Sequence, residues 1–169
     1  MKYIISTLLT LAIVVGIAST VQAKRGSDGQ LNLVYWQAPS TMNPNLSGGT
    51  KELEASSVVL EPLGRYDETG NLLPWLAEEI PTVSNGGISK DLTTITWKIK
   101  KGIKWSDGSA LTADDAVFTY EYCSNPDTGC TQSNYWSDIK SVTAVNSVTV
   151  KVEFTVPKPF PYAPFVGYN

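Results

Sequence analysis

The chain has no histidine and only two cysteines among its 169 residues. Without an imidazole there is no Ser-His-Asp or Cys-His arrangement and no histidine base for proton transfer. Two thiols with no histidine cannot complete a tetrahedral zinc site from the usual ligands. The G-x-x-x-x-G-K-[ST] and G-x-G-x-x-G phosphate loops are missing as well. These absences weigh against an enzyme and favour a protein that binds.

Long runs of charge of either sign are also missing. The 13 Lys and Arg residues against 16 Asp and Glu residues give a formal charge of -3. Removal of an N-terminal segment that contains Lys2 would leave 12 against 16, a formal charge of -4. A mildly acidic chain with scattered charges is poorly suited to a polyanion. We therefore expect no nucleic acid partner.

The first 23 residues have the pattern of an export signal. Lys2 gives a short positive start, Ile4 to Ala18 is mainly apolar, and Val21-Gln22-Ala23 places small residues at a cleavage position. The apolar run is shorter than the roughly 20 residues that span a bilayer, and no strongly basic flank follows it. We predict a signal peptide at 1–23, cleaved after Ala23, rather than a membrane anchor. No cysteine follows that would carry a lipid, so the expected product is a soluble periplasmic protein.

The most informative stretch runs from Thr94 to Val117. Ile95, Trp97 and Ile99 alternate with polar residues, which predicts a strand with one buried face. Trp105 is expected to return to that buried face, and Ser106-Asp107-Gly108 has the composition of a turn.

A helix is predicted to begin at Thr112. Its hydroxyl suits an N-cap, and Asp115, three residues on, can complete a capping box. Asp114 and Asp115 could also be taken as a carboxylate pair for acid–base work, but a place in the first helical turn favours capping. An apolar stripe should face the sheet, formed by Ala113, Ala116, Val117 and Tyr120.

Periodicity and turn residues predict four further elements. They are a helix over 50–60, a hairpin over 63–74, a short helix over 75–80 that carries the solvated pair Glu78-Glu79, and a second hairpin that joins 139–145 to 148–154.

The stretch from Trp97 to Phe118 follows the pattern W-x-[IFL]-x-x-G-[IV]-K-W-x-D-G-x-x-[LF]-T-A-[DE]-D-[AV]-x-[FY]. This pattern resembles the signature of the extracellular solute-binding proteins of the peptide and nickel-binding family, which feed ABC importers. Leu63 to Glu79 also looks like that family. The resemblance covers nearly everything from Leu31 to Asn169 and corresponds to the N-terminal third or so of such a protein.

The resemblance implies an α+β fold of the periplasmic-binding-protein type, type II, in its three-subdomain peptide-binding form. Only the N-terminal part of lobe I would be present. After the signal peptide, 24–45 would hold the mature N-terminus and a first strand of the main lobe, starting at Leu31. Residues 46–169 would form an accessory subdomain, truncated before the second lobe.

Cys123 and Cys130 enclose six turn-forming residues. In an oxidising compartment we expect them to form a small disulfide at the end of the predicted helix, and a metal site is the less favoured alternative. A loop this short stabilises a fold by about 2 to 3 kcal/mol on the chain-entropy account.

The 17 aromatic residues (5 Trp, 8 Tyr and 4 Phe) keep a second class open, a secreted carbohydrate-binding or adhesion module. Packing explains most of them: Trp97 and Trp105 are expected on the buried face, and Tyr66, Trp75 and Tyr120 against the core.

The candidates for ligand contact are Tyr35, Trp36, Gln37 and Ala38, which end the first predicted strand. In similar proteins an extended peptide lies there, although core or hinge packing would explain the aromatic pair equally well. The resemblance implies a monomeric receptor without cofactor, metal or catalysis. It would bind a peptide, or another small solute such as nickel, opines or sugars, and deliver it to ABC permease subunits in the membrane.

Overall fold

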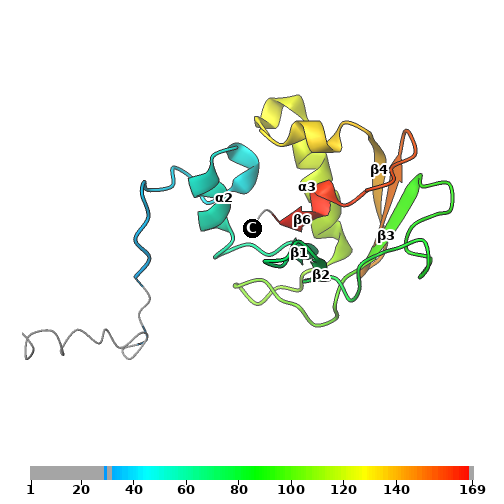
Figure 1. Ribbon diagram of the computed structural model, residues 1–169, viewed down its shortest axis with the longest axis horizontal. Coiled ribbons are helices and arrows are strands. Elements are labelled where there is room, and N and C mark those ends of the chain that lie inside the picture. Colours follow the sequence, from blue (N-terminus) through cyan, green and yellow to red (C-terminus); the bar gives the residue numbers. More distant parts are fainter. Residues whose placement is uncertain (1–28, 30–31, 168–169) are drawn as a thin grey trace, which may run out of the picture. The chain divides into compact units, whose positions relative to one another are not determined.

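The computed structural model describes residue 29 and residues 32–167, and the chain divides into two units, 1–36 and 37–169 (Figure 1). The predicted signal peptide lies outside the described residues. The strand predicted to start at Leu31 is absent from residues 32–36, which have no regular secondary structure. A strand needs a neighbour for its backbone N–H and C=O groups, and within residues 32–167 no strand pairs with this segment.

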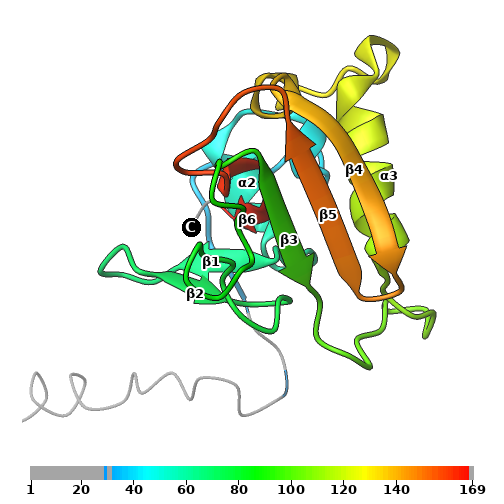
Figure 2. The same cartoon turned by 90° about the vertical axis from the view of Figure 1, so that its right-hand side faces the viewer.

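The larger sheet has the strand order β3-β5-β4 and is antiparallel throughout (Figure 2). Its strands are β3 (Thr94–Lys98), β4 (Ile139–Asn146) and β5 (Thr149–Phe154). Ile95 pairs with Val152 and Trp97 with Val150, and all four side chains are fully buried. The period-two pattern and the second hairpin are therefore confirmed.

Helix α3 (Ala113–Ser124) lies against this sheet, beside β4 (Figure 2). The capping box forms: the backbone N–H of Thr112 donates to Asp115 Oδ2 at 2.7 Å. Ala113 is completely buried, and Ala116, Val117 and Tyr120 pack against the core. The start of the helix and its apolar stripe are as predicted, and Asp115 is a capping residue.

The smaller sheet has the order β2-β1-β6. Its first two strands, β1 (Gly64–Tyr66) and β2 (Leu72–Pro74), form the predicted hairpin. The third strand, β6 (Val166–Gly167), runs parallel to β1 and was not predicted. The two residues of β6 are too few for a period-two pattern to be recognised.

The hairpin turn between β1 and β2 is held by Asp67. Its carboxylate accepts the backbone N–H groups of Thr69 and Asn71 at 2.9 and 2.8 Å, and the Asn71 amide at 3.0 Å. These hydrogen bonds, those from Asn71 foremost, lower the pKa of Asp67 to about 2.

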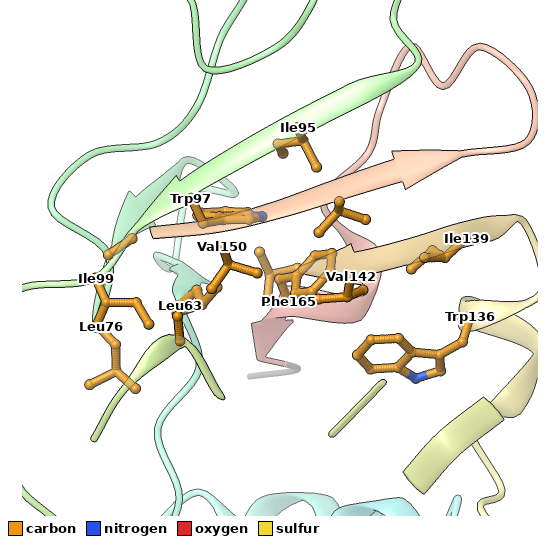
Figure 3. Close-up of a cluster of buried hydrophobic side chains, with 14 of the residues drawn as sticks. Leu63, Leu76, Ile95, Trp97, Ile99, Trp136, Ile139, Val142, Val150 and Phe165 are labelled. Carbon is orange, nitrogen blue, oxygen red and sulfur yellow. The ribbon is translucent and has the colours of Figure 1, made fainter. Parts of the chain in front are cut away.

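Trp97 occupies the middle of the hydrophobic core (Figure 3). Its ring centroid lies 6.0 Å from that of Phe165 and 6.1 Å from that of Tyr162. Phe165 in turn meets Trp136 edge-on at 5.6 Å. The aromatic rings of the C-terminal segment thus cover the inner face of the larger sheet. The indole N–H of Trp97 is buried and finds no hydrogen-bond acceptor among the residues that the structure describes, so shape and dispersion hold this side chain in place.

Three predictions for this part of the chain are wrong. Trp75, expected to pack against the core, is 38% exposed and has the Arg65 guanidinium 4.3 Å from its ring centroid. Residues 75–80 form no helix, because their backbone N–H groups donate across the chain: that of Ala77 to the carbonyl of Leu63 at 3.0 Å and that of Glu78 to the carbonyl of Lys98 at 2.7 Å. Trp105 is 39% exposed and does not return to the buried face, because it follows the end of β3 and lies in a turn region.

The remaining helices are short. Helix α2 (Thr50–Ser56) confirms the predicted helix but ends before residue 60. Four 3-10 turns complete the described chain: η1 (Pro44–Leu46), η2 (Pro126–Thr128), η3 (Ser133–Trp136) and η4 (Ala163–Phe165). In the part of the chain that the structure describes, no helix has the length and apolar character needed to cross a bilayer.

Candidate functional site

The four predicted contact residues are all exposed and divide between the two units. Tyr35 and Trp36 belong to the first unit, where their ring centroids lie 6.0 Å apart and Trp36 is 71% exposed. Gln37 and Ala38 begin the second unit. Exposure is what a ligand contact requires, but their role stays a prediction.

Residues 37–60, which begin with Gln37 and Ala38 and contain η1 and α2, are called the arm below. Glu52 connects two parts of the arm, the loop at Ser40 and helix α2, and this residue is only 2% exposed. The backbone N–H and the hydroxyl of Ser40 donate to Glu52 Oε1 at 2.9 and 2.8 Å. Lys51 forms an ion pair with Glu52, and its Nζ donates to Ser40 Oγ at 3.0 Å. The loop that carries Gln37 and Ala38 is thereby fastened to α2.

These contacts stabilise the ionised form of Glu52. The bond from Lys51 and those from Ser40, in that order, lower its pKa from 4.5 to about 2. Gly49 leaves room for the carboxylate, since a Cβ at that position would lie 2.5 Å from Glu52 Oε2. Glu52 therefore stays charged at any physiological pH, and its role is to anchor backbone.

An open cavity of about 300 Å³ lies between the arm and the rest of the second unit. Its walls are mainly apolar, with polar groups such as Glu61 and Gln132 among them. Representative lining residues are Leu53 and Leu60 from the arm, Ala116 from α3, and Trp105, Trp136 and Phe165 from the remainder. The volume is at the lower end of the range for small-molecule pockets, and such walls suit an apolar group.

Beside the cavity, the arm is joined to the residue that follows the second cysteine. The backbone N–H of Thr131 donates to the carbonyl of Asn45 at 2.8 Å, and its hydroxyl donates to the same oxygen at 3.3 Å. The predicted disulfide between Cys123 and Cys130 is present. Asn45, which accepts these bonds, and Gln132, which follows Thr131, both line the cavity.

Sequence patterns missed Ser40, Asn45, Glu52 and Thr131. Glu52 stands in a helix in which charged residues normally face solvent, and Asn45 and Thr131 are 86 positions apart. Polar partners at that separation leave no periodic trace in a single sequence. Within residues 32–167 no three His, Cys, Asp or Glu side chains gather in a way that could hold a metal ion.

Comparison with known proteins defines the class to which this fold belongs. The family model "Bacterial extracellular solute-binding proteins, family 5 Middle" matches residues 71–168, more than half of the chain. The chain belongs to this family, whose members are substrate-binding proteins of transporters. The implied fold is shown as well, because solved peptide-binding proteins of this type share it.

Three relatives illustrate the match. A probable ABC transporter-binding protein from Deinococcus radiodurans is 38% identical over 130 residues, which is 75% of this chain and 21% of the relative. OppA of Haemophilus influenzae, solved in complex with RPPGFSPFR, superposes with a TM-score of 0.67 at 26% identity over 75% of this chain and 27% of that one. NikZ of Campylobacter jejuni, solved with Ni(L-His), gives a TM-score of 0.63 at 28% identity, and the match covers 76% of this chain and 24% of that one.

The chain thus spans about a fifth to a quarter of the length of the relatives it matches. What the named complexes bind is a property of those longer proteins.

Proposed function

We propose that this chain is part of the substrate-binding component of an ABC importer, exported to the periplasm by a cleavable signal peptide at residues 1–23. Family membership through residues 71–168 is the observation that carries the proposal. In the domain arrangement proposed here, residues 24–45 belong to the main lobe, and 46–169 form an accessory subdomain of the same lobe. The alternative of a carbohydrate-binding or adhesion module is not favoured by any relative named above.

The proposed mechanism is capture without chemistry. A solute held between two lobes stabilises the closed state by its differential affinity for that state, and the closed protein then delivers it to the permease subunits. The absence of histidine supports this reading, because the usual proton-transfer group is missing. We propose a monomer, since one receptor presents one ligand to the transporter.

The proposed cargo is a peptide, with Tyr35, Trp36, Gln37 and Ala38 along its path. An exposed aromatic pair offers stacking surface, one of the contacts that a bound peptide can use.

A thermal-shift comparison tests the proposed cargo. The complete substrate-binding component that contains this chain would be heated with peptide pools, with Ni(L-His) and with oligosaccharides, and a ligand specific for the folded state raises the melting temperature by mass action. We expect peptides to raise the melting temperature, and we expect Trp36→Ala to abolish this shift. Trp75→Ala is the control and should keep it, because the Trp75 ring is covered by the Arg65 guanidinium, whose carbon lies 4.3 Å from the ring centroid. A shift with oligosaccharides alone would favour the alternative module, and no shift with peptides would refute the proposed cargo for this chain.

Export is tested separately. The secreted chain should be recovered from the periplasm with Lys24 as its first residue. Retention in the cytoplasm with Met1 in place would contradict the proposed localisation without bearing on the cargo.

A further inference from the structure

The disulfide closes the chain at the end of α3. Cys123 is 1% exposed and Cys130 is 9% exposed, so the bond lies inside the fold. The loop that it encloses is also held by Thr128, whose single hydroxyl proton is shared between the carbonyl oxygens of Tyr122 and Asn125, 2.7 and 2.8 Å from its Oγ1. The residue after Cys130, Thr131, therefore starts from a fixed point beside the helix.

From that point Thr131 reaches the arm. Its backbone N–H and hydroxyl both donate to the Asn45 carbonyl, at 2.8 and 3.3 Å. Asn45 is itself fixed within the arm, because its backbone N–H donates to Asn43 Oδ1 at 2.9 Å and the next N–H, that of Leu46, donates to the Asn43 carbonyl at 3.1 Å. A displacement of Thr131 is thus transmitted to η1.

The cavity makes this contact important for the position of the arm. On the arm side, Leu53 and Leu60 face a space of about 300 Å³, and Ala116 and Phe165 lie on its other side. A gap removes the dispersion contacts that normally fix two packed elements against one another. Where packing is incomplete, polar contacts at the edge contribute a larger share of the positioning.

We propose that the Cys123–Cys130 disulfide is a positioning element for the arm, acting through the hydrogen bonds from Thr131 to Asn45. The arm in turn fastens Ser40 through Glu52, two residues from Ala38. The bond at the end of α3 would therefore set the place of Gln37 and Ala38, residues far from it in sequence. Their role as ligand contacts depends on the proposed function, whereas the positioning of the arm does not.

Hydrogen exchange at single amides tests the proposal without any ligand. In the full chain, Cys123→Ser with Cys130→Ser is expected to raise exchange at Thr131 and at the arm amides of Leu46 and Leu53 about tenfold or more. Amides of β3 and β5 in the larger sheet exchange through global unfolding, so their rates should rise only by the factor that the loss of unfolding free energy in the same variant gives. Arm amides that kept their rates, or rose only by that same factor, would overturn the proposal, because the disulfide would then have no specific effect on the arm.

A second variant keeps the disulfide. Thr131→Val removes only the hydroxyl donor and should raise exchange in the arm about two- to fivefold, as expected for one hydrogen bond. Thr131→Ser should restore the rate. The matched control is Thr155→Val, since Thr155 donates its N–H and hydroxyl to one carbonyl, that of Asp138, at 2.9 and 3.2 Å and makes no such contact with the arm. Equal effects of the two valine variants on the arm would refute a specific role for Thr131.

The two proposals fail separately. If no peptide shifts the melting temperature, the proposed cargo fails and the exchange measurements still decide the role of the disulfide. If peptides bind equally well with and without the disulfide while the arm loosens, the positioning stands and the contact role of Gln37 and Ala38 is refuted.

Discussion

The larger sheet with α3 and the arm are stabilised in different ways. In the sheet, apolar side chains such as Trp97 and Val150 are completely buried and meet one another directly. In the arm, the fully enclosed side chains are polar, Glu52 and Ser56, and a cavity separates it from the core. A filled apolar core is held mainly by side-chain packing, whereas a segment beside a cavity depends more on its polar contacts.

The largest expected effect is on the sheet. Trp97→Ala removes the ring that joins β3 to Phe165 and Tyr162 and should lower the free energy of unfolding by about 3 to 5 kcal/mol. Trp105→Ala is the control, because that side chain is 39% exposed and its truncation leaves no closed cavity. Urea denaturation of both variants measures the difference. Equal losses would contradict the description of Trp97 as the centre of the core.

The disulfide affects both regions. Cys123→Ser with Cys130→Ser should lower the free energy of unfolding by about 2 to 3 kcal/mol, the amount expected for a loop this short. Urea denaturation gives this value, and the exchange measurement proposed above gives the effect on the arm. A loss below about 1 kcal/mol combined with a loosened arm would sharpen the comparison, because the bond would then act on position far more than on stability.

A smaller effect separates two adjacent carboxylates in α3. Asp115→Ala should cost about 1 kcal/mol, because Asp115 accepts the N–H of Thr112 in the capping box. Asp114→Ala should cost about 0.3 kcal/mol, since it interacts with the same helix end but is exposed. Thermal unfolding of the pair measures the difference, and equal losses would show that the helix dipole, not the cap, explains both.

The smallest expected effect is local to the arm and depends on pH. The pKa of Glu52 is lowered in the folded chain from 4.5 to about 2, so its stabilising contacts are complete above about pH 4.5. They are lost as the pH falls from there toward 2. The protection factor of the Ser40 amide, which is corrected for the intrinsic pH dependence of exchange, should fall over this window, and Glu52→Gln should abolish that fall. An unchanged pH profile in Glu52→Gln would show that another group controls the arm.

Much of the fold could be predicted because it depends on neighbours in sequence. The alternation of Ile95, Trp97 and Ile99 identified β3, and Thr112 with Asp115 identified the start of α3. The helix predicted over 75–80 failed because backbone donors there pair with residues of other segments, such as Leu63 and Lys98. Local composition carries no information about such partners.

The candidate site was less predictable for the same reason. The segment from Tyr35 to Ala38 is exposed, and its role in ligand contact, which came from a family resemblance, stays a prediction. The contacts that fix the arm, from Glu52 to Ser40 and from Thr131 to Asn45, join polar residues without periodic spacing. Only the folded backbone brings them together.

The parallel pairing of β6 with β1 has a consequence for the order of folding. Gly64 pairs with Val166 and Arg65 with Gly167, so closing this contact requires a loop of about a hundred residues, and distant contacts of this kind form slowly. The adjacent strands β4 and β5 need only a short turn. That hairpin can therefore form while β1 still awaits its third strand, and pulse-labelling during refolding would detect the delay as late protection at Val166.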